Sequence, residues 1–330
     1  MHRKIFISML AFTVVALACR SAAKLTPVPE SQTTTTVEGQ ASPGAQPSDS
    51  FNESEESPEQ LLKDIIASAE DVQRDITYCT VDGVELKMNM YFPKNTTEPT
   101  PLVVFIHGGG WSKGDKTSKV GMTDVPALLE AGFTVASLNY RLATEYQFPV
   151  MLQDVKCAIR SFRANADQYN IDADKIGLWG ESAGGHLSSM IGLTDESAGF
   201  DVGQYLDQSS RVNVVIVLSG PTDLTTDFSP AFIEAKSNAF VDYDMVKASP
   251  ITYITFDDPP FLILQGDKDI ALPISSGQSQ KFFDGLIAAG VEAQLVIVQN
   301  GPHLLNAPDQ TPSRAELTQM IVQFFEQHLK

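Results

Sequence analysis

The feature that most constrains this chain is the hexapeptide Gly-Glu-Ser-Ala-Gly-Gly at residues 180–185. An apolar run typical of a β-strand, residues 175–179, comes directly before it, and a helical pattern follows. A serine on such a tight strand-to-helix turn adopts strained backbone angles, so the residues two positions before and after it must be small. The turn lifts the hydroxyl above the sheet, and the helix N-terminus favours negative charge beside it. The pattern therefore predicts Ser182 as a nucleophile.

A second glycine-rich segment lies upstream, where the apolar run 102–106 ends. It consists of His107, three glycines and Trp111. Without Cβ atoms, these glycines leave their backbone N–H groups open to a substrate oxygen. Together with the amide of Ala183 they predict an oxyanion hole. A glycine-rich loop can also hold a phosphate, but the sequence contains neither a P-loop nor a GxGxxG motif.

The general base follows almost by elimination. The five histidines of the chain are His2, His107, His186, His303 and His328. The first would leave with an N-terminal signal, and the last is two residues from the C-terminus. His107 lies inside the glycine-rich segment, and His186 lies one helical turn after Ser182 on the same helix. His303 remains, in a loop after the last predicted strand, and is the predicted base.

Two aspartates follow the strand predicted at 261–265, and either could orient the base. Asp269 is the better candidate, because it falls in a Gly-x-x-Asp-x-x-x-Pro spacing, whereas Asp267 suits a turn. The resulting chain order of serine, aspartate and histidine accords with a nucleophile elbow. We predict a triad of Ser182, Asp269 and His303.

Strand-like and helix-like runs alternate after about residue 58. The predicted strands are residues 75–80, 85–92, 102–107, 134–139, 175–179, 212–218, 261–265 and 293–298. The predicted helices are residues 123–131, 150–166, 183–193, 275–289 and 314–328. The runs 102–106 and 212–218 are almost wholly apolar, as in parallel strands covered on both faces. The pattern predicts an α/β fold with a mostly parallel eight-stranded sheet, an antiparallel start and helices on both faces.

With these motifs the chain resembles the α/β-hydrolase esterases and lipases of the hormone-sensitive-lipase-like and BD-FAE-like (carbohydrate or feruloyl esterase) groups. The matching segments are residues 107–111, 114–116, 140–142, 148–149, 154, 176–187, 219–224, 249–250 and 266–273. The resemblance spans about residues 84–303. It implies the same triad, oxyanion donors at Gly109, Gly110 and Ala183, and structural roles for Arg141 and Asp154.

Three residues depart from the family pattern. Thr144 stands where a proline is usual, Gln265 replaces a common histidine, and Leu304 breaks a polar-aromatic pattern after the predicted base. None of them removes a catalytic group, so they bear on substrate choice. We predict substrate contacts at Trp111, beside the glycines, and at Glu181, beside the nucleophile.

A long segment at 223–249 carries several aromatic residues and sits where this fold inserts cap elements. We expect a partial cap with substrate contacts there rather than a plain surface excursion. The amphipathic stretch 61–72 could pack over the same mouth.

Composition limits the partners. A formal net charge of −18 over 330 residues would repel nucleic acid and an anionic membrane surface, and a small ester is the expected substrate. No CxxC or histidine-rich pair indicates a metal, and we expect no cofactor. Nothing in the sequence sets the oligomeric state.

Together these features predict a serine carboxylesterase that hydrolyses short-acyl or aromatic-acyl esters through an acyl-enzyme. One alternative is an amidase or peptidase on the same fold, although such prolyl-peptidase-like enzymes usually carry a large extra β domain. The other is a non-catalytic, surface-anchored binding protein. That state usually lacks a triad member, and all three are present here.

The N-terminal segment predicts export. Three residues with basic side chains precede a short apolar run, residues 5–18, and Ala16-Leu17-Ala18 before Cys19 resembles both a signal-peptidase site and a bacterial lipobox. We predict a signal peptide at 1–19, a disordered Ser/Thr/Pro/Glu-rich linker at 20–58 and a catalytic domain at 59–330. The chain would be a bacterial membrane lipoprotein, touching the membrane only through its lipid, or otherwise a secreted or periplasmic protein. An uncleaved anchor is a third alternative.

Two further cysteines, Cys79 and Cys157, would remain in the exported chain. Export permits a disulfide between them. Cys79 lies in a predicted early strand and Cys157 on a later helix, and no sequence feature brings their Cα atoms within reach. We therefore expect two buried thiols.

Lipidation at Cys19 is directly testable. Expressed with its N-terminal segment in a bacterial host, the chain should fractionate with membranes and incorporate labelled palmitate, since several acyl chains give near-permanent attachment. Cys19→Ser should abolish labelling and release the protein to the soluble fraction. A soluble wild-type chain that begins at Cys19 without lipid would support the secreted form instead.

Overall fold

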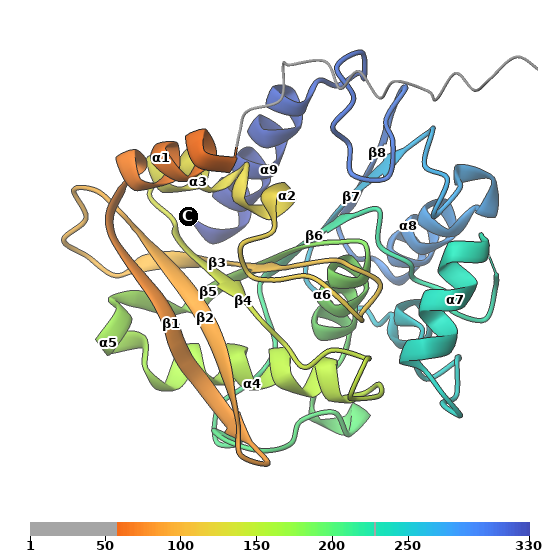
Figure 1. The fold of residues 1–330 in the computed structure, drawn as a ribbon, viewed down its shortest axis with the longest axis horizontal. Coiled ribbons are helices and arrows are strands. Elements are labelled where there is room, and N and C mark those ends of the chain that lie inside the picture. Colours follow the sequence, from red (N-terminus) through yellow and green to blue (C-terminus); the bar gives the residue numbers. More distant parts are fainter. Residues whose placement is uncertain (1–57, 228) are drawn as a thin grey trace, which may run out of the picture. The chain divides into compact units, whose positions relative to one another are not determined.

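One eight-stranded sheet organises the computed structural model, which describes residues 58–227 and 229–330 (Figure 1). The strands are β1 (Ala69–Val81), β2 (Val84–Pro93), β3 (Thr100–Ile106), β4 (Thr134–Leu138), β5 (Ile171–Glu181), β6 (Val214–Leu218), β7 (Phe261–Gly266) and β8 (Ala293–Val298). Their order across the sheet is β1-β2-β4-β3-β5-β6-β7-β8. β2 pairs antiparallel with β1 and with β4, and the pairs from β4 across to β8 are parallel. The predicted sheet is therefore confirmed.

Helices cover both faces of this sheet. The α-helices of the described residues are α1 (Pro58–Ser68), α2 (Lys119–Met122), α3 (Val125–Glu130), α4 (Val150–Ala164), α5 (Ala166–Tyr169), α6 (Ala183–Leu193), α7 (Pro230–Ala239), α8 (Gln278–Ala289) and α9 (Arg314–Leu329). Figure 1 shows α1, α3 and α9 on one face, and α4 and α6 on the other. No helix in the described part of the chain is both long and apolar enough to cross a membrane.

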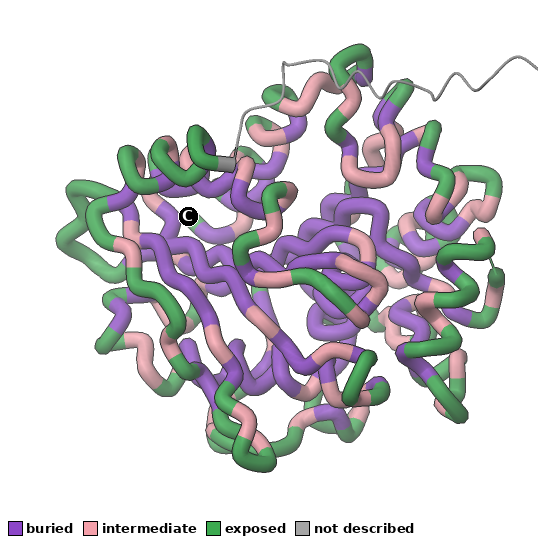
Figure 2. Tube along the Cα trace, in the orientation of Figure 1, coloured by how far each residue is buried: buried purple, intermediate pink, exposed green. Residues whose placement is uncertain are grey.

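The central strands are buried on both faces, as their apolar composition predicts (Figure 2). Along β3, Val104 and Ile106 contribute to the core under α4 and α6, whereas Val103 and Phe105 contribute to the core under α3 and α9. This alternation follows from the two-residue period of a strand. Burial on both faces fixes the register of β3 firmly, because a slip of one residue would exchange the two side-chain sets.

The first helix differs from the predicted amphipathic stretch at 61–72. α1 ends at Ser68, and Ala69 already pairs with Pro93 in the β1–β2 hairpin. Leu61 and Ile65 of α1 are buried in the same apolar cluster as the side chains of α3. The predicted helix is therefore present, but the residues from Ala69 onward form a β-strand paired with β2 instead of the last predicted helical turn.

Residues 1–57, which contain the predicted signal peptide, Cys19 and nearly all of the predicted linker, lie outside the described residues.

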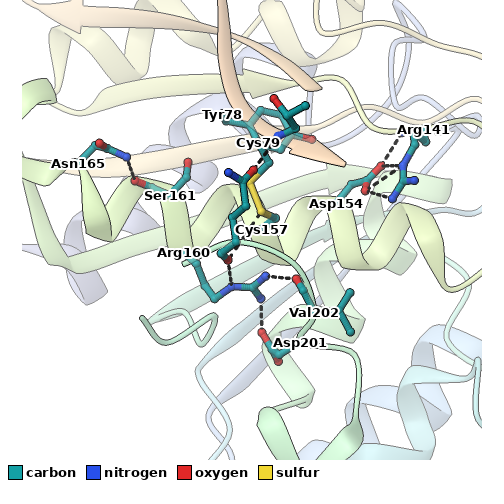
Figure 3. Close-up of a disulfide and its surroundings, with 12 residues drawn as sticks. Tyr78, Cys79, Arg141, Asp154, Cys157, Arg160, Ser161, Asn165, Asp201 and Val202 are labelled. Atoms are coloured by element: carbon teal, nitrogen blue, oxygen red, sulfur yellow. Dashed lines mark hydrogen bonds and ion pairs between the residues drawn. A yellow bond between two sulfur atoms is a disulfide. The ribbon is translucent and has the colours of Figure 1, made fainter. Parts of the chain in front are cut away.

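Cys79 on β1 and Cys157 on α4 form a disulfide, which corrects the expectation of two thiols (Figure 3). Their Cα atoms are 6.5 Å apart although 78 positions separate them in sequence. The side chain of Arg160, one turn further along α4, forms an ion pair with Asp201 and hydrogen bonds to the backbone of Val202. The bridge thus fastens the edge hairpin to a helix that the rest of the fold holds in place.

Removing this disulfide should lower the free energy of unfolding by about 2–4 kcal/mol, since the bridge closes a long loop in the unfolded chain. The test compares urea unfolding of the wild type with that of the double variant Cys79→Ser, Cys157→Ser. With added reductant, the wild-type midpoint should fall to that of the variant. Equal midpoints without reductant would show that the bridge contributes no stability.

Candidate active site

Ser182 occupies the sharp turn between β5 and α6. Its backbone angles are φ 50° and ψ −116°, in a region that residues with a Cβ atom rarely occupy. A Cβ atom on Gly180 would lie 2.3 Å from the carbonyl oxygen of Gly184, and one on Gly184 would lie 2.0 Å from that of Ile106. The positions two residues before and after the serine must therefore be glycine, and the predicted strand–turn–helix geometry is present.

His303 and Asp269 meet at the ends of β8 and β7. Nδ1 of His303 lies 2.7 Å from Oδ2 of Asp269. The Asp269 side chain is fully buried, and its Oδ1 accepts hydrogen bonds from the backbone N–H groups of Ala271 and Leu272 at 2.8 and 2.7 Å. With Nδ1 donating to the carboxylate, Nε2 is the ring nitrogen left to accept a proton.

The other candidate acid, Asp267, does not reach the histidine. Its carboxylate lies 3.8 Å from the ammonium of Lys268, and within the described residues its buried Oδ1 has no hydrogen-bond partner. The structure therefore brings Asp269, and not Asp267, to His303.

Ser182 and His303 line one cleft of about 900 Å³. Residues 108–110, called the oxyanion loop below, form part of its wall. Gly109 and Gly110 have φ +109° and +59°, and a Cβ atom on Gly109 would lie 2.1 Å from the carbonyl oxygen of Lys113. Among the described residues, no protein acceptor is bonded to the amides of Gly109, Gly110 or Ala183, so these amides are available to a ligand oxygen.

The segment after β4 contacts His107, the residue directly before the oxyanion loop. The ring of Tyr140 stacks on His107 at 4.3 Å, and its hydroxyl donates to the carbonyl oxygen of His107 at 2.9 Å. Arg141 donates to both carboxylate oxygens of Asp154 on α4, at 3.0 and 2.7 Å. This buried pair holds the segment against α4, in agreement with the structural roles that the resemblance implies. Burial lowers the pKa of His107, which suits a histidine that supports the loop.

A sequence model of the BD-FAE family matches residues 88–286. The chain belongs to the BD-FAE family. The matched region contains Ser182, the oxyanion loop and Asp269. His303 lies beyond it, so the place of the histidine rests on the geometry described above.

Named relatives agree with this membership. Esterase LipC of Mycobacterium tuberculosis is 30% identical over 193 residues, covering 56% of this chain and 48% of LipC. The probable carboxylic ester hydrolase LipM of the same organism is 30% identical over 240 residues, covering 69% and 54%. The chain thus spans about half the length of these curated relatives.

Solved structures show the same fold, which is the α/β-hydrolase fold. A truncated form of a carbohydrate esterase from gut microbiota superposes with a TM-score of 0.68 at 26% identity, covering 79% of this chain and 96% of that one. A bifunctional GH43-CE protein of Bacteroides eggerthii gives 0.67 at 30% identity, covering 78% and 38%.

The two predicted substrate contacts lie at the cleft but are held by the protein. Trp111 is 1% exposed, and its Nε1 donates to Nδ1 of His186 at 3.2 Å. Glu181 is 5% exposed, and its Oε1 accepts a hydrogen bond from the Gly108 amide at 3.3 Å. The sequence motifs predicted that both residues lie near the cleft. They did not predict that each side chain forms a hydrogen bond to another residue of the protein.

The segment 223–249 contributes α7, which forms a side wall of the cleft. The cleft lining from this helix comprises Ala231, Phe232, Glu234, Ala235 and Asn238. The ring of Phe232 also packs against Trp111, with ring centroids 6.1 Å apart. This is the position expected of a partial cap. The described residues 61–72 contribute no side chain to the cleft lining; they line a separate cavity between α1, α2 and the β1–β2 hairpin.

Within residues 58–227 and 229–330, no group of three His, Cys, Asp or Glu side chains is placed to hold an ion.

His186 is buried below the cleft and held as a neutral ring. Its Nε2 lies 2.8 Å from the carbonyl oxygen of Ala248, and its Nδ1 accepts the Trp111 hydrogen bond. Burial lowers the pKa of His186 from 6.5 to about 4, against the opposing effect of the Ala248 carbonyl. Protonation would place a second donor opposite the Trp111 N–H.

Stability should therefore depend on pH through His186. Because its native pKa of about 4 lies below its usual value of 6.5, unfolding takes up a proton between these pH values, and the free energy of unfolding falls as the pH drops through this window. The full difference is about 3 kcal/mol. In His186→Gln, whose amide can donate to Ala248 and accept from Trp111, this contribution should vanish.

Urea unfolding of both proteins at pH 7.5, 5.5 and 4.5 measures the effect. Other titrating groups are common to both proteins and cancel in the difference. A wild-type minus variant difference that stays constant across these pH values would contradict the prediction.

Proposed function

We propose that the chain is a serine carboxylesterase that hydrolyses short-acyl or aromatic-acyl esters through an acyl-enzyme. The observation that carries the proposal is one cleft lined by a strained Ser182, by His303 paired with a buried Asp269, and by the oxyanion loop. Nucleophile, oriented base and open amide donors are the three parts that acyl transfer needs.

The reaction would proceed in two halves. Nε2 of His303 accepts the proton of the Ser182 hydroxyl as its Oγ attacks the ester carbonyl carbon. The carbonyl oxygen becomes an oxyanion that the amides of Gly109, Gly110 and Ala183 stabilise. The tetrahedral intermediate collapses, the C–O bond to the alcohol breaks, and His303 returns the proton to the leaving alkoxide. Water then attacks the acyl-enzyme with the same proton route and releases the carboxylic acid.

Asp269 supports this cycle without moving a proton itself. Two backbone amides and the Gln265 side chain hold its carboxylate in place. It fixes the His303 tautomer and stabilises the imidazolium that forms in each half-reaction. The names of LipC and LipM, both described as ester hydrolases, support the same reaction class.

We also propose that the chain works outside a reducing cytosol. The Cys79–Cys157 disulfide supports this, because such bridges persist in exported proteins and are rare in cytosolic ones.

Ser182→Ala and His303→Ala should each lower ester turnover by about three orders of magnitude or more, because triad members act as a unit. Hydrolysis of p-nitrophenyl butyrate measures this, and unchanged melting temperatures establish that both variants fold. If Ser182→Ala kept more than about a tenth of the wild-type rate, the assignment of the nucleophile would be wrong.

The two aspartates provide a matched comparison. Asp269→Asn replaces the carboxylate beside His303 with a neutral amide, which cannot stabilise the imidazolium. It should cost somewhat less than loss of the serine, whereas Asp267→Asn should cost little. Reversal of these two effects would move the acid to Asp267.

Short acyl chains should be preferred over long ones. Lipid-binding lids need a mobile amphipathic flap, whereas α7 is a single helix of 10 residues whose Phe232 is buried against the cleft wall. Rates on soluble acetyl and butyryl esters should exceed those on emulsified long-chain triglyceride. Faster hydrolysis of the emulsion would overturn the proposed acyl preference.

A further inference from the structure

We propose that Glu181 is a positioning residue of the oxyanion loop, acting as a hydrogen-bond acceptor for the amide of Gly108. This inference rests on the proposed esterase function and adds a residue to it. Glu181 touches no reacting atom in this role; it sets where the amides of Gly109 and Gly110 stand relative to Ser182.

Glu181 ends β5 and directly precedes the nucleophile. Its Oε1 accepts two hydrogen bonds at 3.3 Å, one from the Gly108 amide and one from the hydroxyl of Ser118. One side-chain oxygen therefore joins three segments: the strand that carries Ser182, the oxyanion loop, and the residue that precedes α2.

The oxyanion loop and the nucleophile turn are also in close contact. A Cβ atom on Gly108 would lie 2.9 Å from the carbonyl oxygen of Glu181 and 3.2 Å from Cβ of Ser182. A small displacement of Gly108 would thus shift the neighbouring amides relative to the serine. Because a misplacement of 1 Å in an active site can cost about 100-fold in rate, this hydrogen bond can affect catalysis strongly.

The surroundings of the Glu181 carboxyl group indicate that its role depends on an oxygen that accepts a hydrogen bond, and less on its negative charge. Oε2 is buried and, within the described residues, has no hydrogen-bond partner. A buried carboxylate with one unpartnered oxygen is unfavourable, and a neutral acid still offers Oε1 to Gly108. Burial raises the pKa of Glu181, against the lowering effects of Gly108, Ser118 and the charges of His303 and Arg314.

This reasoning distinguishes two substitutions of similar length. Glu181→Gln keeps a carbonyl oxygen for the Gly108 amide and cannot ionise. Glu181→Met fills similar space with no oxygen acceptor, and Glu181→Leu repeats the comparison should the methionine variant fail to fold. Glu196→Gln, at an exposed glutamate outside the cleft, controls for loss of a negative charge.

The experiment measures kcat and KM on p-nitrophenyl butyrate, together with the affinity for an alkyl boronic acid. Such an acid forms a tetrahedral adduct with the serine and places an oxygen against the oxyanion donors. We expect Glu181→Gln to keep kcat within about threefold of the wild type. Glu181→Met should lower kcat by about 100-fold with little change in KM, and it should weaken boronic acid binding by a similar factor.

Two results would overturn the proposal. Wild-type kcat and boronic acid affinity in Glu181→Met would show that the hydrogen bond to Gly108 does not position the loop. Equal losses in Glu181→Gln and Glu181→Met would show that the charge, and not the acceptor, matters. An inactive wild type, or an active Ser182→Ala variant, would instead contradict the esterase assignment itself, so the two failures are distinguishable.

Discussion

The whole site depends on the close approach between the turn that carries Ser182 and the end of β3. β3 and β5 are parallel neighbours, with Ile106 opposite Gly180. The carbonyl oxygen of Ile106 occupies the space in which a side chain on Gly184 would begin. Because no Cβ stands there, α6 can start directly beside the oxyanion loop. This steric constraint explains why glycine is needed on both sides of the strained Ser182. It also lets the amides of the oxyanion loop and of the first residue of α6 lie close enough to bind the same oxyanion.

The three histidines near the site differ in burial and in hydrogen bonding, and these differences decide which of them can act as a base. His186 is enclosed, with both ring nitrogens bonded to the protein, and its low pKa keeps it neutral. His107 is stacked on Tyr140, and its Nδ1 lies 2.8 Å from the carbonyl oxygen of Gly108. His303 differs, since its ring is partly exposed in the cleft and one nitrogen lies on a buried carboxylate. A base needs an oriented ring and an accessible nitrogen together, and among these three only His303 has both.

The sequence predicts what depends on local pattern and misses what depends on side chains meeting across the fold. All eight strands and the helix after Ser182 follow from hydrophobic periods of two and about 3.6 residues, and the structure contains them. The Cys79–Cys157 bridge joins residues 78 positions apart, and the hydrogen bond from Gly108 reaches Glu181 across 73 positions. Hydrophobic periodicity is a local property of the sequence and does not predict contacts between residues so far apart. The helical pattern at 61–72 was wrong at its end for a related reason, because the pairing partner of Ala69 lies on β2.

Gln265 shows how a departure from a family pattern can preserve a site. Its Nε2 donates to Oδ2 of Asp269 and to the carbonyl oxygen of Leu272, both at 3.0 Å, and its Oε1 accepts from the hydroxyl of Ser279. Every polar atom of the amide is therefore engaged within the buried end of β7. An imidazole at this position could also donate to the acid, but it could gain a proton as the pH falls, whereas an amide cannot. The neutral amide thus holds Asp269 in place without adding a group that changes charge with pH.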